Sequence, residues 1–339
     1  MLLFADSFDH YNTSQMTRKW SVNDNGSIGS YGRNSTSGYR TGAFNDFDGA
    51  SIAVPSNPAR VISGFAYKAA SLPIAEKVIF ACNESGSNHT NIRLQTDGKF
   101  KAYRNTTSLG TSSAGVSASA YNYIEIDTTI HDSTGAITLK VNGVSVLALT
   151  SQDTRNSGTG VITNVIMGGS GASGPTPYYG YGDFDDFYLI DTTGGTNNTF
   201  LGDVRVQAIY PTGAGNYTQW TPSTGSNYQN VDDNPANDDT DYNSSSTANQ
   251  KDSFAFGDVT PTSGTVYGVQ VNLVTRKDDG GTRSIRSLNR LSGTDANATA
   301  QTIGSSYANY AFIHETKPGG GSFSITDVNN SEFGYEITA

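Results

Sequence analysis

Apolar and polar residues alternate along many short stretches of this chain. The clearest stretches are 123–127 (Tyr-Ile-Glu-Ile-Asp) and 137–141 (Ile-Thr-Leu-Lys-Val), whose period of two predicts strands with one buried face. Asn142-Gly143 is a strong hairpin signal, and it predicts that 144–149 folds back onto 137–141. The run 182–191 (Gly-Asp-Phe-Asp-Asp-Phe-Tyr-Leu-Ile-Asp) predicts a further strand. Together these elements indicate an antiparallel sandwich.

Similar short runs of β-branched and aromatic residues, broken by Gly, Asn and Asp, continue along the whole chain. Sustained helical periodicity is absent from the sequence, so few helices are expected. The fold class predicted is all-β, with two β-sandwich (jelly-roll-like) domains. The other expected strands are 2–8, 51–54, 61–68, 78–82, 91–95 and 100–104, followed by 252–256, 267–275, 284–291, 307–314 and 333–337.

Composition agrees with a β-rich, turn-rich protein. The 339 residues include 38 Gly, 19 Tyr and 15 Phe, and only 15% are charged. This length predicts about two domains. The polar run 193–199 has no apolar anchor before Phe200, so the predicted organisation is a first domain at 1–192, a linker at 193–199 and a second domain at 200–339.

The first half resembles the laminin-G-like branch of the concanavalin A-like lectin and glucanase superfamily. The residues that carry the resemblance are Lys140-Val141-Asn142-Gly143-Val144-Ser145-Val146, the glycine-rich loop 168–182, and Asp185-Asp186-Phe187-Tyr188-Leu189. The resemblance covers about residues 1–192 and implies that the first strand pairs near 184–190. The superfamily hosts lectins, glycosidases and structural modules, so it implies fold more than function.

Charge and cysteine usage exclude several classes of function. The formal net charge of −10 argues against nucleic-acid binding, which needs a basic face. Cys82 is the single cysteine, so an intrachain disulfide is excluded. The N-terminal residues lack a basic region and a long apolar run, and no stretch is apolar enough to span a membrane. We therefore expect no signal peptide and no membrane insertion.

Glu125-Ile126-Asp127 matches the start of the E-x-D-x-E strand motif of the glucanases in the resembled superfamily. Alternation would direct both carboxylates to one face of a strand, as hydrolysis of a glycosidic bond requires. The later motif positions are Thr129 and Ile130, so the second catalytic carboxylate is missing. A solvent-facing strand without catalytic function is the favoured interpretation.

A short acidic loop offers many hard oxygen ligands of the kind that Ca²⁺ prefers. It lacks the spacing of an EF-hand, so a solvated acidic turn and a structural calcium site are both open interpretations. The candidate ligands are Asp232, Asp233, Asp238, Asp239 and Asp241. Asp185 and Asp186 are adjacent on a predicted strand and are therefore expected on opposite faces rather than around one ion.

Aromatic side chains on loops suggest sugar stacking, with packing in a core or interface as the alternative. The candidates for glycan binding are Tyr178, Tyr179, Tyr181 and Trp20, with Trp220 as a secondary choice. The four histidines show no zinc-binding spacing, and Cys82 lies in an apolar strand where a core role is expected. No other cofactor is expected.

The second half resembles the region that follows a laminin-G-like module in structural proteins of tailed bacteriophages. The segments that carry this resemblance are 198–206 (Asn-Thr-Phe-Leu-Gly-Asp-Val-Arg-Val), 218–223 (Thr-Gln-Trp-Thr-Pro-Ser), 252–256 (Asp-Ser-Phe-Ala-Phe) and 333–337 (Phe-Gly-Tyr-Glu-Ile). None of them carries a recognisable catalytic group.

The leading hypothesis is therefore a non-enzymatic virion protein, displayed on the capsid or tail as a decoration, fibre or adhesion component. It would act by assembly with other virion proteins and with copies of itself, with host-surface glycan contact as a further expectation. The resemblance implies synthesis in the host cytoplasm and residence in the virion. The alternatives are a carbohydrate-binding adhesin and a glycoside hydrolase.

Overall fold

The computed structural model describes residues 1–22, 33–34, 38–40, 42–46, 49–168 and 182–339. It divides into two units, Met1–Val206 and Gln207–Ala339, which are described separately below. No helix among the described residues has the length and apolar character needed to cross a bilayer.

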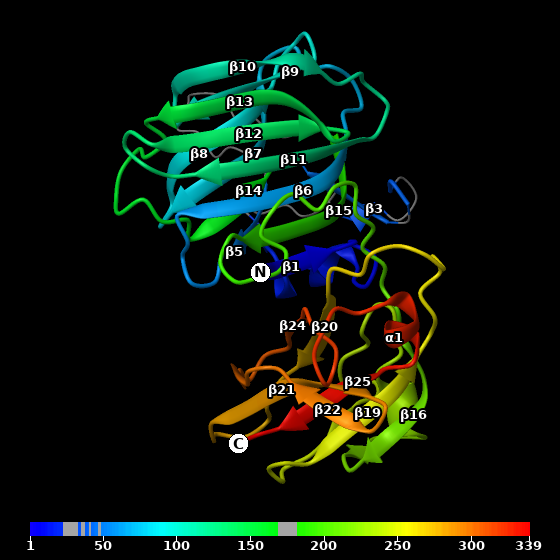
Figure 1. Cartoon of the computed structure of the whole chain (residues 1–339). Coiled ribbons are helices and arrows are strands. Elements are labelled where there is room, and N and C mark those ends of the chain that lie inside the picture. The colour runs from blue at the N-terminus through cyan, green and yellow to red at the C-terminus, as the bar shows by residue number, and fades with distance from the viewer. Residues whose placement is uncertain (23–32, 35–37, 41, 47–48, 169–181) are drawn as a thin grey trace. The chain divides into compact units, whose positions relative to one another are not determined.

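The first unit consists of two antiparallel sheets stacked face to face, seen as front and rear layers in Figure 1. Sheet A contains, in spatial order, β13 (Val144–Gln152), β12 (Gly135–Val141), β11 (Asn122–Thr129), β6 (Arg60–Lys68), β15 (Gly182–Asp191), β4 (Ala43–Asp46) and β3 (Arg33–Asn34), and β1 (Leu2–Asp6) also pairs with β15. Sheet B contains β10 (Thr107–Gly115), β9 (Lys99–Arg104), β8 (Ser87–Leu94), β7 (Lys77–Glu84), β14 (Asn164–Met167), β5 (Ala50–Ala53) and β2 (Ser21–Val22). The predicted all-β sandwich is confirmed.

Apolar residues of the central strands fill the space between the two sheets. Ile124 and Ile126 of β11 and Phe65 of β6 are fully buried in one core cluster with residues of sheet B. The hairpin between β12 and β13 turns at Asn142 and Gly143, whose φ angles are 50° and 79°, as a two-residue turn of this kind requires. The hairpin and the pairing of β1 with β15 are therefore as predicted.

A buried carboxylate fixes the chain after β1. Asp6 accepts hydrogen bonds from the Phe8 N–H (2.8 Å), the Tyr11 hydroxyl (2.9 Å) and the Trp20 indole (2.7 Å). Lys19 completes the network at 3.2 Å from Asp6. Burial opposes ionisation of Asp6, but Lys19 and these hydrogen bonds outweigh it and lower its pKa. The segment that includes the 3-10 helix Thr13–Arg18 is thereby held to the core.

The second unit contains a six-stranded sheet, sheet C, and two two-stranded sheets, of which β20 (Val269–Thr275) and β24 (Ala308–His314) form the one that packs on sheet C. Phe254, Ile285 and Phe312 share a core cluster that joins these two sheets, so this unit also has two β layers. Sheet C contains β16 (Pro211–Thr218), β19 (Lys251–Phe256), β25 (Glu332–Ile337), β21 (Arg283–Leu291), β22 (Thr294–Asn297) and β23 (Gln301–Ile303); β17 (Thr221–Pro222) pairs with β18 (Asn243–Ser244). The helices are η2 (Asn227–Asn230) and α1 (Ile325–Asn329).

Asp252 organises the second unit as Asp6 organises the start of the first. Its Oδ1 accepts from the N–H groups of Gln219 (2.7 Å) and Trp220 (3.0 Å). Its Oδ2 accepts from the Asn227 amide (2.6 Å) and the Tyr335 hydroxyl (3.4 Å). Asp252 is fully buried, so these donors replace the water that its carboxylate loses on folding.

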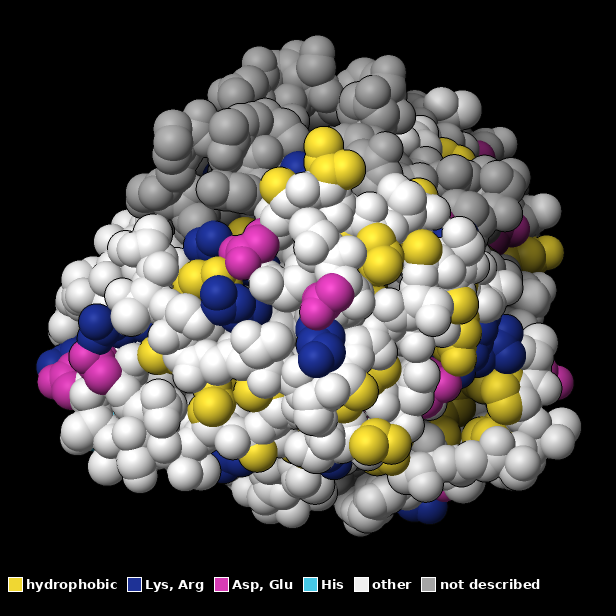
Figure 2. All heavy atoms as spheres, turned by 90° about the horizontal axis from the view of Figure 1, so that it is seen from above, with side chains coloured by type: hydrophobic (Ala, Val, Ile, Leu, Met, Phe, Trp, Pro, Cys, Tyr) yellow, Lys and Arg dark blue, Asp and Glu magenta, His cyan; other side chains and the backbone are white. Residues whose placement is uncertain are grey.

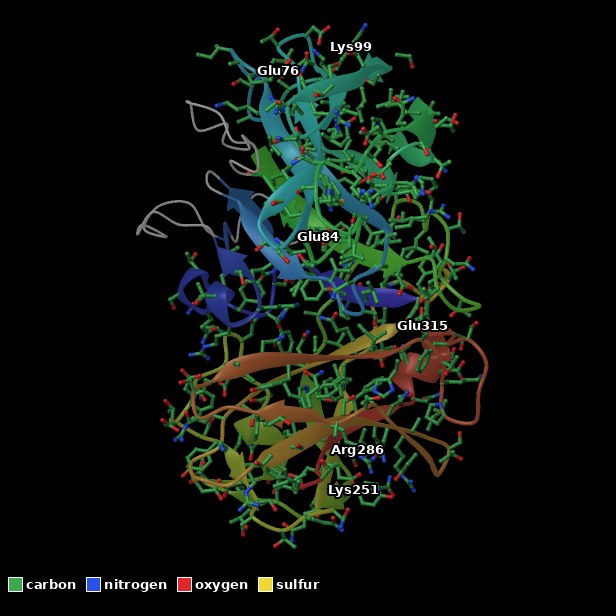
Figure 3. The ribbon with its side chains drawn as sticks, turned by 90° about the vertical axis from the view of Figure 1, so that its left-hand side faces the viewer. Glu76, Glu84, Lys99, Lys251, Arg286 and Glu315 are labelled. Atoms are coloured by element: carbon green, nitrogen blue, oxygen red, sulfur yellow. The ribbon has the colours of Figure 1, made fainter. Side chains whose placement is uncertain are left out.

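Charged side chains also cross-link the outer face of sheet C. Glu336 of β25 forms an ion pair with Arg286 of β21 at 2.8 Å and a second, longer one with Lys251 of β19 at 3.7 Å. Figure 3 shows Arg286 and Lys251 near each other in this unit. The pairing connects three neighbouring strands across the sheet surface.

The structure differs from the predicted organisation in two ways. The first unit ends at Val206 rather than at residue 192, because residues 200–206 bind to sheet A instead of opening the second unit. The structure also contains strands that the sequence pattern does not predict, among them β10, β14 and β16. Small and polar residues dominate β10 and β16, which therefore lack clear alternation.

We expect Gly64→Ala to destabilise the first unit. The ring of Tyr188 covers Gly64, and a Cβ at this position would lie 2.1 Å from Cε1 of that ring. Overpacking of this kind costs roughly 1–3 kcal/mol. Chemical denaturation should show this loss for Gly64→Ala and almost none for Gly195→Ala, where no atom lies within 4 Å of the added Cβ. Equal stability of the two variants would contradict the assigned packing of Tyr188.

Candidate functional site

The outer face of sheet A, opposite the core, carries a cluster of acidic and aromatic side chains. Glu125 projects from β11 and Tyr188 from β15, on either side of β6. Because Gly64 of β6 has no side chain, the Tyr188 ring can lie across it. The Tyr188 hydroxyl then donates a 2.7 Å hydrogen bond to Oε1 of Glu125. The absence of a side chain on one strand thus lets two neighbouring strands share a polar contact.

Residues 200–206, here called the strap, cover this cluster. The Gly202 N–H donates to Oε1 of Glu125 at 2.8 Å, and the Leu201 N–H lies 3.3 Å from the Tyr188 hydroxyl. At the other end of the strap, the Val206 N–H donates to Oδ1 of Asp186 at 2.6 Å. Glu125 is only 1% exposed as a result. Backbone amides of the strap therefore satisfy part of the hydrogen-bonding capacity of both carboxylates, Glu125 and Asp186.

A β-bulge brings Asp185 and Asp186 to this site. The pairing register of β15 with β6 shifts between Asp185 and Tyr188, and Asp186 has φ = 49°. This conformation is strained for a residue other than glycine, and at bulges it redirects side chains. The carboxylates of both residues consequently reach the same neighbouring segment, which contains Tyr39 and Arg40.

Asp185 and Asp186 bind different groups of the segment that contains Tyr39 and Arg40. Oδ2 of Asp185 accepts from the backbone N–H groups of Tyr39 (2.7 Å) and Arg40 (3.3 Å). Asp186 forms an ion pair with the Arg40 guanidinium. Arg40 also donates to the Val204 carbonyl (2.7 Å) and to Asp203 (3.0 Å), both in the strap. Arg40 therefore links the bulge to the strap.

Burial shifts the ionisation of both aspartates. Burial, together with the adjacent negative charge of Asp186, raises the pKa of Asp185 to about 8. Burial also raises the pKa of Asp186, to about 6, although Val206 and Arg40 favour its ionised form. The charge of this site therefore changes between mildly acidic and mildly alkaline pH.

The arrangement of these carboxylates is suited to attaching the strap and the segment at residues 39–40 to sheet A. The carboxylate oxygens of Asp185 and Asp186 accept hydrogen bonds from the protein's own backbone or from Arg40. A general acid or nucleophile needs an oxygen that can approach a substrate. In the conformation described, the strap and the segment at residues 39–40 occupy those positions. Perturbed pKa values here accompany structural contacts, as they also do in ion-pair networks.

Two predictions about these residues are wrong. Glu125 lies on a strand as predicted, but it is not solvent-facing, because Tyr188 and the strap bury it. Asp127 is paired with Arg60 at 2.6 Å. Asp185 and Asp186 do not lie on opposite faces, because the bulge breaks the alternation on which that expectation rested. Sequence reasoning also missed Arg40, which lies in a region of few apolar residues.

The predicted glycan-binding aromatic residues have different outcomes. Trp20 is 1% exposed and packs against Phe4, Phe8 and Phe187, so its ring is part of the core and cannot stack on a sugar. Trp220 packs edge-on against Tyr335 at 4.7 Å. Tyr178, Tyr179 and Tyr181 lie outside the described residues.

The carboxylates of the acidic loop have different surroundings. Burial and the charges of Asp241 and Asp232 raise the pKa of Asp233, which places these carboxyl groups close together. Asp239 instead pairs with Arg276 at 2.9 Å, and Asp238 has φ = 61°. In the part of the chain that the structure describes, no three His, Cys, Asp or Glu residues form a group that could hold a metal ion. The calcium site stays a prediction.

Cys82 and His314 are buried. Cys82 is fully buried in the core, and burial raises its pKa to about 12, so the thiol is neutral at physiological pH. His314 bonds to the Ser287 hydroxyl at 2.8 Å, and burial lowers the pKa of His314 to about 4.

The face of the molecule seen in Figure 2 carries several acidic side chains that lie beside Lys or Arg.

No protein-family model and no curated protein matches this chain. Among solved structures, it is similar to the alginate lyase Aly36B, with 14% identity over 56% of this chain and 96% of that one, at a TM-score of 0.37. It is also similar to a carbohydrate-binding module (CBM40) of the Ruminococcus gnavus IT-sialidase bound to α2,3-sialyllactose, with 17% identity over 43% and 88% of the two chains and a TM-score of 0.34.

A third similar structure is the Trypanosoma rangeli sialidase in complex with 2,3-difluorosialic acid, with 13% identity and a TM-score of 0.35. The match covers 44% of this chain and only 24% of the sialidase. Similarities at this level do not assign an activity or a ligand.

The raised pKa of Asp185 predicts that stability depends on pH. Its native pKa of about 8 lies above the ordinary value of 3.8, so between these values the folded state holds a proton that the unfolded chain has lost. This stabilisation is complete below the ordinary pKa and is lost progressively as the pH rises through the native pKa, with a slope approaching about 1.4 kcal/mol per pH unit. Urea unfolding of the first unit at a series of pH values across this window measures the slope.

Asp185→Asn should flatten that slope between about pH 6 and pH 8, above the range in which Asp186 also loses its extra proton, even though the substitution weakens contacts to the segment at residues 39–40. The matched control is Asp97→Asn, at an exposed turn. This control should keep the slope of the unmodified chain. An unchanged slope in Asp185→Asn would show that Asp185 is not the titrating group.

Proposed function

We propose that this chain is a non-enzymatic structural protein of a tailed-bacteriophage virion, displayed on the capsid or tail and acting through protein–protein assembly. The observation that carries the proposal is the engagement of Glu125, Asp185 and Asp186 with the chain's own backbone. The acidic groups that could have served hydrolysis are used to hold a scaffold together.

The segments of the phage resemblance support the proposal because each has a role in the fold. Segment 198–206 includes the strap. Segments 252–256 and 333–337 form the neighbouring strands β19 and β25, with Phe254 opposite Phe333. Segment 218–223 contains Trp220, whose N–H binds Asp252 and whose ring packs on Tyr335. The resemblance therefore concerns the architecture of these proteins, which is what a structural virion component would share.

The proposal predicts that the chain is a regular component of purified particles. Phage particles produced from the genome that encodes this chain are purified by density-gradient centrifugation. They should contain the chain at a fixed ratio to the major capsid protein, as measured by quantitative mass spectrometry. Electron microscopy of the same particles should show density of sandwich-shaped units at repeated positions. A soluble host protein followed through the gradient serves as the control for contamination. Absence of the chain from intact particles would refute the proposal.

The enzyme alternative has its own test. If the chain were a glycoside hydrolase that uses the strand motif, Glu125→Gln would abolish release of reducing sugar from surface polysaccharides. The proposal expects no release from either the unmodified chain or this variant. Because the carbonyl oxygen of the introduced glutamine side chain can still accept hydrogen bonds from Tyr188 and Gly202, the variant should remain folded and the comparison should be valid.

A further inference from the structure

The loop between β6 and β7 carries the most exposed apolar side chain among the described residues. Ile74 is 100% exposed and Leu72 is 36% exposed. Pro73 between them is buried, so the loop is anchored at its centre while the side chains on either side face solvent. Single exposed apolar residues are common, but complete exposure of an isoleucine next to an exposed leucine is costly in water.

Cations gather around this loop. Leu72 lies 3.4 Å from the position that a Cβ on Gly98 would take, which places the loop against the start of β9. Figure 3 shows Glu76 and Lys99 at the same end of the first unit. The neighbouring charged residues on β7, β8 and β9 and their connections are Lys77, Arg93, Lys99 and Lys101, with Glu76 and Asp97.

These residues leave a local excess of positive charge on an acidic protein. Three lysines and the largely buried Arg93 lie here with two carboxylates, whereas the whole chain has 21 Lys and Arg against 31 Asp and Glu. Glu76 is shared between Arg93 at 3.5 Å and Lys101 at 3.9 Å, so one carboxylate serves two cations. The guanidinium of Arg93 and the ammonium of Lys101 also lie over the Tyr103 ring, at 4.0 and 5.1 Å from its centre.

We propose that this end of the first unit, Leu72 and Ile74 together with Lys77, Lys99 and Lys101, docks on a membrane surface that contains anionic phospholipid headgroups. Exposed aliphatic residues gain free energy by entering the boundary between headgroups and acyl chains, and each nearby lysine adds electrostatic attraction to anionic lipid. The net negative charge of the rest of the chain directs the contact to this end. The inference does not depend on which particle carries the protein.

The chemistry favours lipid over a soluble acidic polysaccharide. Sugar rings bind to flat aromatic faces and to hydrogen-bonding groups. The large exposed side chains of this loop, Leu72 and Ile74, are aliphatic. An acidic polysaccharide would use the lysines but would gain little from Ile74, so the contribution of Ile74 separates the two partners.

Vesicle flotation with the full chain tests the proposal. We expect binding to phosphatidylcholine vesicles that contain about one third phosphatidylglycerol and little binding to pure phosphatidylcholine. Raising the ionic strength to about 1 M, where the Debye length is about 3 Å, should weaken the binding. No flotation with the anionic vesicles, or equal flotation with both kinds, would overturn the proposal.

Two variants with matched controls identify the surface. Ile74→Ser should weaken binding about tenfold, whereas Val144→Ser, at a hairpin position that is 65% exposed, should leave it unchanged. Lys99→Glu should weaken binding at least about fivefold, whereas Lys277→Glu in the second unit makes the same change in net charge and should have no effect. Thermal unfolding confirms that each variant is folded.

Other patterns would overturn the proposal. If Ile74→Ser binds as well as the unmodified chain, the loop is not the contact. If dissolved polygalacturonate competes for the chain with an affinity that depends on Lys99 but not on Ile74, the surface recognises an acidic polysaccharide instead.

Discussion

Buried carboxylates that accept backbone N–H groups hold the peripheral segments of this protein to its sheets. A carboxylate loses several hydrogen bonds to water on burial, and that loss is destabilising unless the protein supplies other donors. Asp6, Glu125 and Asp186 in the first unit and Asp252 in the second are almost fully buried. Each receives a backbone N–H from a segment that lies beside its own strand. The polar, weakly charged composition is compatible with a stable fold for this reason.

Backbone geometry decides where these carboxylates can act. Gly64 leaves room for Tyr188 to cross β6, and the bulge at Asp186 rotates two successive aspartates toward Arg40 and the strap. Without the bulge, one of the two would point into the apolar core. The positive φ of Asp186 costs conformational energy, which its contacts to Val206 and Arg40 offset. Local strain and the attachment of the strap therefore depend on each other.

The sequence predicts strands well where apolar and polar residues alternate, as in β11 and β12. It predicts poorly the strands made of small polar residues, such as β10, because their burial depends on neighbours that are distant in the chain. The sequence does contain a sign of the bulge in β15. Phe184 and Phe187 are three residues apart yet both lie in the core, so strict alternation cannot hold between them. The burial of Glu125 left none, because the strap that covers it is distant in sequence.

The second unit shows how folding can dictate the residue types in a sequence pattern. The segments at 218–223, 252–256 and 333–337 converge on one buried group, Asp252, through the N–H of Trp220 and the hydroxyl of Tyr335. Replacing Asp252 or Tyr335 would leave a buried polar atom without a partner, and replacing Trp220 would remove its aromatic contact with Tyr335. Folding is therefore sufficient to explain the residue types at these positions, whatever contacts the exposed surfaces of the second unit make.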